Sequence, residues 1–228
     1  MKIEERYVLV GTSHVSKDSK IKIKEKFNDF KPDIIAIELD KQRFQALASN
    51  QKSSMSPRLI LQIGLTGYIF AVIGKLIQNK IGDVVGMNPG AEMMLGAQLA
   101  RNNKLLLALI DQDVAITLKG LSKRVKFSEK LKIFWDIIAS PFAKKEKIKI
   151  DVAKIPPNEL IVKMLTEMKG RYPGFYKVLL EDRNKVMAKK IYTLLVKHPE
   201  SKVLAVIGAG HKEGIKDHIN KLIASNVY

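Results

Sequence analysis

Four short runs of hydrophobic residues divide the chain into segments of mixed polarity. They span Tyr7–Val10, Asp33–Ile37, Leu105–Ile110 and Val203–Ile207. None of them alternates between hydrophobic and polar positions, which is typical of strands covered on both faces in a parallel or mixed sheet. The pattern therefore predicts four buried strands.

Between these runs, hydrophobic residues recur with the period of a helix. The pattern predicts helices at Lys17–Phe30, Ala91–Arg101, Asn158–Lys169, Tyr172–Lys197 and Gly214–Ala224. Ser16 is a suitable N-cap for the first helix, and the double proline at 156–157 marks the start of the third. Strands that alternate with helices predict an α/β fold with a mixed, largely parallel central sheet covered by helices.

The connection between the third and fourth runs is far longer than a simple crossover needs. We interpret residues 112–198 as a helical insertion within a single α/β domain that spans residues 1–228. Its first part, residues 119–154, holds 11 basic and 4 acidic residues with four aromatic residues among them. This segment is a candidate contact surface for lipid headgroups or nucleic acid. Alternatively, its aromatic side chains form a core and its lysines are simply solvated, and we favour this interpretation.

The composition excludes several kinds of chemistry but does not identify the function. The 228 residues include no cysteine, which excludes disulfides, thiolate nucleophiles and cysteine-ligated zinc and favours a reducing cytoplasm. The formal charge of +17 favours an anionic neighbour, either a membrane face or nucleic acid. Charge alone supports the nucleic-acid interpretation, so we do not favour it.

The most membrane-like segment is Leu59–Gly74, which has 16 uncharged residues. A helix that spans a bilayer needs roughly 20 apolar residues, so a buried or amphipathic helix is the better interpretation. The N-terminus carries two acids and only a short apolar run, so no signal peptide is expected. We expect a cytoplasmic protein, with membrane association and self-association through residues 59–76 as open alternatives.

Chemically useful side chains follow all four predicted strands. His14 and His211 each stand three residues after a glycine that closes a strand, Glu38 follows the second strand and Asp111 the third. Ligands of open α/β sheets bind at the carboxyl ends of the strands. The sequence therefore predicts one crevice in which two imidazoles and at least two carboxylates meet.

Such a group of side chains suits a divalent metal ion. Glycine-rich phosphate loops and the GxSxG nucleophile elbow are both absent from the sequence. Two neutral imidazoles and a carboxylate can hold an ion and leave a position for water, whose pKa falls to roughly 7. A second carboxylate can accept the proton, and an arginine can stabilise the oxyanion. Glu92 and Arg183 could join, or could be only a helix-start acid and part of a solvated stripe.

The motifs GTSH, PDIIAIELDKQRF, NPGAEM, LIDQDVAITL, LLEDRNKVMA and VIGAGHKEGI occur in an order that resembles the TraB/PrgY family, with its Tiki and GumN relatives. The resemblance runs from about residue 7 to residue 219. It implies a fold of the erythromycin-esterase/ChaN-like group and a site built from His14 and His211, with matches at Glu38, Arg43, Glu92 and Arg183. Tiki members are regarded as divalent-metal-dependent proteases, and PrgY-type members are linked to the shutdown of peptide pheromones.

We therefore expect a metal-dependent peptidase or related hydrolase that acts on a peptide or small molecule. His14, His211 and Glu92 are the expected ligands of a manganese, cobalt or zinc ion. Glu38 is the expected base, although it could exchange roles with Glu92, and Arg43 and Arg183 hold the substrate or stabilise charge. The alternative is a non-catalytic module that sequesters a peptide or small ligand in the same crevice.

Two features depart from the family pattern. The third-strand motif usually reads Asp-Arg, whereas this chain has Asp111-Gln112, so one positive charge is missing there. Many microbial relatives continue into membrane helices after the second GxxH motif, and we expect no such anchor in the 17 residues that follow His211.

Overall fold

The computed structural model describes residues 2–12, 17–49, 90–139 and 157–225. His14 and the predicted apolar helix at 59–74 lie outside these residues. Among the described residues, no helix combines the length and the apolar character that crossing a membrane requires.

The described strands form one parallel sheet, which confirms the predicted α/β fold. The strands are β1 (Tyr7–Thr12), β2 (Ile34–Ile37), β3 (Leu106–Leu109) and β4 (Val203–Gly208), and they lie in the order β1-β4-β2-β3. Every neighbouring pair in this sheet is parallel. β1 and β4 extend beyond their hydrophobic runs because they pair up to Thr12 and Gly208. This pairing brings the two glycine-containing strand ends side by side.

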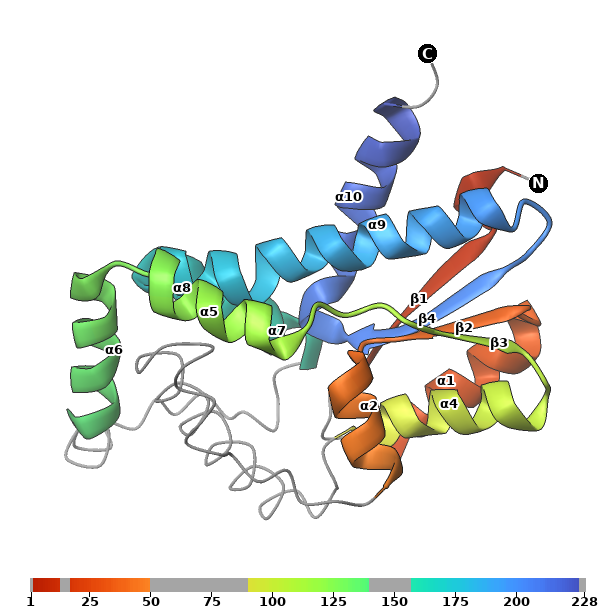
Figure 1. Cartoon of the computed structure of the whole chain (residues 1–228), viewed down its shortest axis with the longest axis horizontal. Helices are drawn as coiled ribbons and strands as arrows, with labels where there is room; N and C mark the ends of the chain where they lie inside the picture. The colour runs from red at the N-terminus through yellow and green to blue at the C-terminus, as the bar shows by residue number, and fades with distance from the viewer. Residues whose placement is uncertain (1, 13–16, 50–89, 140–156, 226–228) are drawn as a thin grey trace.

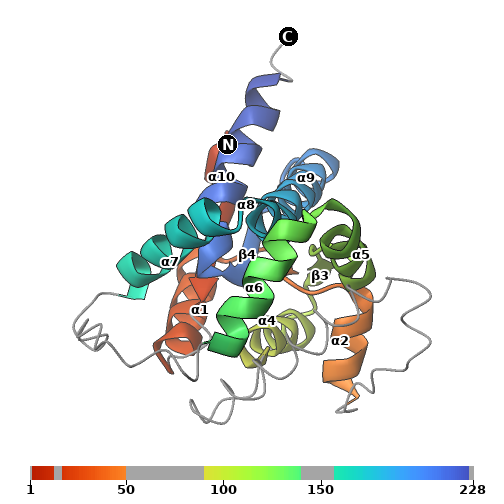
Figure 2. The same ribbon diagram turned by 90° about the vertical axis from the view of Figure 1, so that its left-hand side faces the viewer.

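Helices cover both faces of the sheet (Figure 1). One face is covered by α1 (Lys17–Phe30) and α4 (Ala91–Asn102), and the other by α9 (Asp182–Lys197) and α10 (Lys212–Ser225). Figure 2 looks toward the carboxyl ends of the strands and shows these two helical layers on opposite sides of β3 and β4. Other described elements are η1 (Ile3–Glu5), α2 (Lys41–Ala48), α5 (Val114–Arg124), α6 (Phe127–Ala139), α7 (Pro157–Arg171), α8 (Pro173–Tyr176) and η3 (Ala209–His211).

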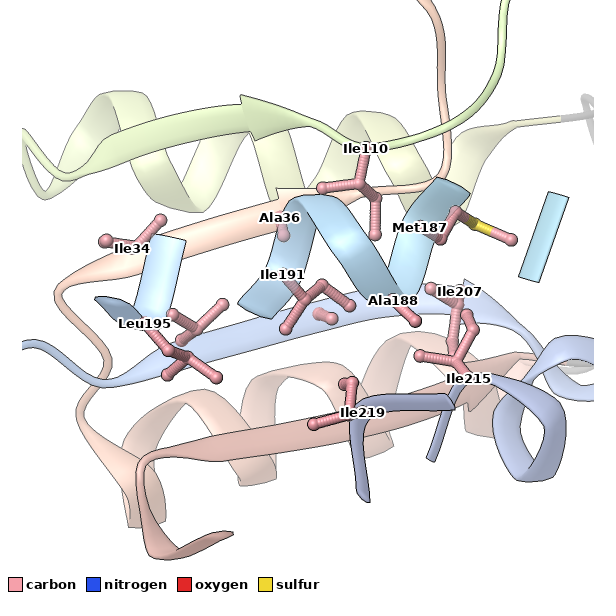
Figure 3. Packing of buried hydrophobic residues seen from close by; sticks show 12 residues of the cluster. Ile34, Ala36, Ile110, Met187, Ala188, Ile191, Leu195, Ile207, Ile215 and Ile219 are labelled. Carbon is pink, nitrogen blue, oxygen red and sulfur yellow. The ribbon is translucent and has the colours of Figure 1, made fainter. Parts of the chain in front are cut away.

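Alternate residues of each strand pack against different helical layers. Ile34 and Ala36 belong to the buried cluster that α9 and α10 complete, with Met187 and Ile191 at its centre (Figure 3). Ile35 and Ile37 belong instead to the cluster on the α1 and α4 side. Because side chains alternate along a strand, the residue after Ile37 points toward α9. That residue is Glu38.

The orientation of α9 is fixed at its C-terminus by Arg6. The guanidinium of Arg6, which is only 5% exposed, donates to the carbonyl oxygens of Leu195, His198 and Pro199 at distances of 2.6–3.1 Å. Helix C-termini leave carbonyls without intrahelical partners, and a cation is favoured there. Arg6 precedes β1, so the C-terminus of α9 lies at the end of the sheet where the strands begin. The first turn of α9 therefore lies at the other end, where the strands have their carboxyl ends, which we call the carboxyl edge.

The single helix predicted at Tyr172–Lys197 is in fact three consecutive helical segments. α8 is followed by a π-helical turn at Lys177–Glu181, which leads directly into α9. Periodicity over the whole region is nearly helical, so one extra residue within a turn does not show in the sequence. π-helical turns are rare and often lie at functional sites. This one places Arg183 in the first turn of α9.

The described part of the proposed insertion lies between β3 and β4 and is built from the helices α5 to α9. On α6, Phe127 is 79% exposed and Trp135 is 58% exposed. The interpretation in which the aromatic side chains of this segment form a core is therefore wrong for these two residues. Contact of residues 119–154 with a membrane surface stays a prediction.

Candidate functional site

Glu38 is the centre of a buried ionic cluster at the carboxyl edge of the sheet. Its Oε2 accepts a 2.6 Å hydrogen bond from the backbone amide of Gly208, at the end of β4. Its Oε1 accepts a 2.5 Å hydrogen bond from Arg183 Nη2 and lies 3.3 Å from His211 Nε2. Three segments that are far apart in the sequence thus meet at one carboxylate.

Arg183 bridges this carboxylate to a second one. Its Nε and Nη2 donate to the two oxygens of Asp111 at 3.0 and 2.7 Å. Asp111, which is 1% exposed, also accepts from Arg43 Nη2, and Arg43 Nε donates in turn to Asp40 at 2.5 Å. Asp40 caps α2 through the amide of Arg43. We call Glu38, Arg183, Asp111, Arg43 and Asp40 the edge network.

The ring of His211 is held from its far side. Its Nδ1 lies 2.6 Å from Oδ1 of Asn184, the residue next to Arg183 on α9. An amide oxygen only accepts hydrogen bonds, so this contact places a proton on Nδ1 and leaves Nε2 to face Glu38. His211 is only 6% exposed because it sits in the η3 turn between β4 and α10. The ring atom of His211 that faces the carboxylate is therefore Nε2.

The cluster keeps its carboxylates ionised. Burial raises the pKa of Glu38, but His211, the charge of Arg183 and the Gly208 amide outweigh it and hold that pKa far below its ordinary value. Burial likewise raises the pKa of Asp111, yet its bonds to Arg183 and the charge of Arg43 lower it overall. A general base works best with a pKa near the working pH. For Glu38, this favours a charge-holding or ligand role over the role of base.

Four of the six predicted site residues thus meet at one place: Glu38, Arg43, Arg183 and His211. Glu92 is buried in the first turn of α4, on the face of the sheet opposite α9. Gly96, one turn later on α4, packs against Ile37 and Val206, which lie near the carboxyl ends of β2 and β4. Since Glu92 is only one turn away from Gly96, it also lies toward the carboxyl edge. His14 lies outside the described residues, two positions beyond the Thr12–Gly208 pair.

Sequence reasoning missed the contribution of Asn184 and the bridging position of Asp111. Asp111 stood out only as a strand-end acid, because its two arginine partners are 68 and 72 positions away in the sequence. Asn184 follows Arg183 directly, and that adjacency is the only signal in the sequence that could have identified it. Lys190 also contacts this site, because its ammonium donates a 2.6 Å hydrogen bond to the backbone carbonyl oxygen of Asp111.

Comparison with known protein families gives a match over nearly the whole chain. The family model described as TraB/PrgY/gumN family matches residues 2–227. The chain belongs to the TraB/PrgY/gumN family. This membership covers the strand-end histidines and every residue of the edge network.

Curated relatives in the TraB/PrgY/gumN comparison extend beyond the matched region. An uncharacterized protein of Methanocaldococcus jannaschii is 36% identical over 226 residues, which cover 96% of this chain and 54% of that protein. The TraB domain-containing proteins of Mus musculus and Homo sapiens are 23% and 22% identical, over 92% of this chain and 62% of theirs. The chain thus spans between half and two thirds of the length of these relatives.

Position 112, where the resemblance to the family implies an arginine, holds a glutamine that the structure accommodates locally. Gln112 is buried, and its side-chain amide donates to Thr117 Oγ1 at 2.9 Å, within the first turns of α5. Asp111 receives its positive partners from Arg43 and Arg183. The charge expected at position 112 is therefore not needed to balance the carboxylate beside it.

The lowered pKa values predict how stability responds to acid. Glu38 and Asp111 have ordinary pKa values of 4.5 and 3.8, and folding depresses both. Their contribution is fully present above those values and is lost as the pH falls toward the folded pKa, because the unfolded chain takes up protons first. Each carboxylate adds a slope of up to about 1.4 kcal/mol per pH unit in this acidic range.

We expect Glu38→Gln and Asp111→Asn to reduce the slope of unfolding free energy between about pH 5 and pH 3. Urea titrations of the wild type and both variants at several pH values measure this slope. Glu25→Gln on the exposed surface of α1 is the matched control and should leave it unchanged. Equal slopes in all four proteins would mean that neither carboxylate is stabilised in its ionised form by folding.

Proposed function

We propose that this chain is a hydrolase of peptide or related carbonyl substrates, with its reaction centre at the His211–Glu38 pair. The observation that supports this proposal is the fixed orientation of His211. Its Nδ1 is bound to Asn184, and its Nε2 lies 3.3 Å from a carboxylate oxygen that stays ionised. An imidazole oriented in this way by a second group is typical of metal ligands and of catalytic bases.

The pair also suits a divalent ion. With only Nδ1 protonated, the ring turns the lone pair of Nε2 toward the oxygen of Glu38, so either a proton on Nε2 or a divalent ion is favoured between them. Two ligand atoms about 2.0–2.2 Å from one tetrahedral ion are separated by a distance close to the observed 3.3 Å. A catalytic ion usually has three protein ligands. Within residues 2–12, 17–49, 90–139 and 157–225, no group of three or more histidine and acidic side chains could hold one.

The proposal therefore assigns the third ligand to His14, which lies outside those residues, with manganese, cobalt and zinc as the candidate ions. Glu92, the other ligand that the sequence predicts, does not form a group of three with His211 and Glu38. When bound, such an ion supplies Lewis acidity and a water molecule of pKa about 7. The side chains of the edge network have separate tasks. Arg183 keeps Glu38 ionised and in place, and Arg43, whose side chain is 37% exposed, presents a cation to a carboxylate or oxyanion of the substrate.

Hydrolysis of a diverse peptide library, followed by mass spectrometry, tests this function. We expect cleavage products from wild-type protein with added manganese, cobalt or zinc, and none after chelation. His211→Ala should lose at least about 100-fold in rate, since it removes both a proposed metal ligand and the ring that Asn184 holds in place. His198→Ala removes an exposed imidazole at the end of α9 and should cleave as the wild type does.

A second candidate is a non-catalytic module that sequesters a peptide or small ligand in the same crevice. It is favoured by the saturation of the edge network, because both oxygens of Glu38 and of Asp111 already accept hydrogen bonds from the protein. A network satisfied in this way can fix a binding surface without turning over a substrate. Peptides that raise the melting temperature but leave no cleavage product under metal excess would support sequestration over hydrolysis.

A further inference from the structure

A shallow cavity of about 550 Å³, wide open to solvent, lies beside the edge network, between α5 and the start of α9. This volume is in the range of small-molecule sites, roughly 300–1,000 Å³. Gln112 and Asp182 line the cavity and are the direct neighbours of Asp111 and Arg183. The cavity therefore adjoins the candidate site without including any residue of the edge network.

The lining of this cavity is strongly cationic. Lys119 and Lys123 stand one turn apart on α5, and Lys185 approaches from α9. All three lysines are exposed, and none forms an ion pair or hydrogen bond with the described part of the chain. The fourth cation, Arg124, has Nη1 at 2.7 Å from Asp182 Oδ2. Four cations thus share one carboxylate.

This arrangement favours an anion over any other ligand. Like charges held on facing helices repel one another, and a bound anion removes that repulsion. The apolar remainder of the lining, Ile116, Gly120 and Val186, forms no hydrogen bonds that would direct a neutral polar ligand. Because two helices bound the cavity, it suits a compact group better than a nucleic-acid duplex.

We propose that this cavity binds a small multivalent anion, whose phosphate or carboxylate groups are held by Lys119, Lys123 and Lys185. The ammonium groups act as charge-assisted donors to the oxygen atoms of the anion. Arg124 remains bound to Asp182 and holds α5 against α9. This assignment does not depend on the proposed hydrolase function, because none of these side chains touches His211 or Glu38.

Isothermal titration calorimetry with inorganic pyrophosphate and with citrate, at constant ionic strength, tests the proposal. We expect one bound anion per chain for at least one of the two probes. Lys119→Ala and Lys185→Ala should each weaken that binding by about tenfold. Lys22→Ala on α1 and Lys216→Ala on α10 remove equally exposed lysines elsewhere and should bind as the wild type does.

His211→Ala should keep full affinity for the anion, so a failure of the hydrolase function leaves this result untouched. Preference for pyrophosphate identifies a phosphate ligand, and preference for citrate a carboxylate ligand. The proposal is overturned if neither probe binds, or if Lys22→Ala weakens binding as much as Lys119→Ala does. It is also overturned if an oligonucleotide without a terminal phosphate displaces the probe, since that indicates a diffuse basic surface.

Discussion

Replacing Arg183 by alanine is expected to lower the free energy of unfolding by about 3–5 kcal/mol, among the largest effects of any single substitution in this chain. The side chain of Arg183 is only 16% exposed, and it bridges Glu38 and Asp111, whose side chains are 10% and 0% exposed. Without the guanidinium, two buried carboxylates are left with much of their charge uncompensated. One partner of a buried pair costs more to remove than the pair contributes, because the remaining charge stays desolvated.

Arg183→Lys should recover only part of this loss, since a point charge cannot bond both carboxylates in the forked geometry of a guanidinium. Arg124→Ala is the matched control, because it breaks the ion pair with Asp182, the residue that directly precedes Arg183. The side chains of Arg124 and Asp182 are 50% and 16% exposed. We expect that control to cost no more than about 1 kcal/mol. Urea denaturation measures all three variants. If Arg183→Ala costs no more than Arg124→Ala, the edge network does not hold the fold together at this edge.

Replacing Gly214 by alanine is expected to weaken metal binding by about 10–100-fold while the protein remains folded. Gly214 lies in the first turn of α10, where a Cβ atom would lie 3.0 Å from Cγ of Asn184 and closer still to its Nδ2. Asn184 is 6% exposed and cannot yield without moving Oδ1 away from His211. The ring would then lose the partner that directs Nε2 toward Glu38.

Titration with zinc or cobalt measures this affinity in Gly214→Ala and in a control, Gly170→Ala. Gly170→Ala is the control, because a Cβ at that position in α7 would meet nothing within 4 Å. Asn184→Asp keeps an acceptor oxygen toward Nδ1 and should retain affinity, whereas Asn184→Leu should lose it. An unchanged affinity in Gly214→Ala and Asn184→Leu alike would show that Asn184 does not position the histidine for an ion.

The sequence predicted the sheet well because its strands are buried on both faces. Continuous apolar runs leave little choice of element, and each of the four runs coincides with one strand of the sheet or with most of one. The carboxyl edge could be named as the candidate site from the sequence because polar residues follow all four runs, and ligands of open α/β sheets bind at the carboxyl ends of the strands. The structure adds the side of the sheet: Ile35 and Ile37 face α4 and Ile34 and Ala36 face α9, so Glu38 points toward α9.

The partners within the site could not be predicted in the same way. The Arg43–Asp111 and Arg183–Asp111 pairs depend on how α2 and α9 approach the sheet, and a one-dimensional pattern does not contain those angles. The π-helical turn at Lys177–Glu181 shifts the register just before Arg183 and Asn184. Hydrophobic periodicity averages over that extra residue, so it gave one long helix and no reason to single out Asn184.

The central claim is that His211 Nε2 and Glu38 share a cation at the carboxyl edge of the sheet. Nitrogen-15 NMR of the histidine side chains during titration with zinc tests it most directly. We predict that the Nδ1 of His211 stays protonated and that its Nε2 resonance shifts on zinc binding, while the resonances of His198 and His218 do not move. A His211 ring that keeps a proton on Nε2 and ignores saturating zinc would contradict the account.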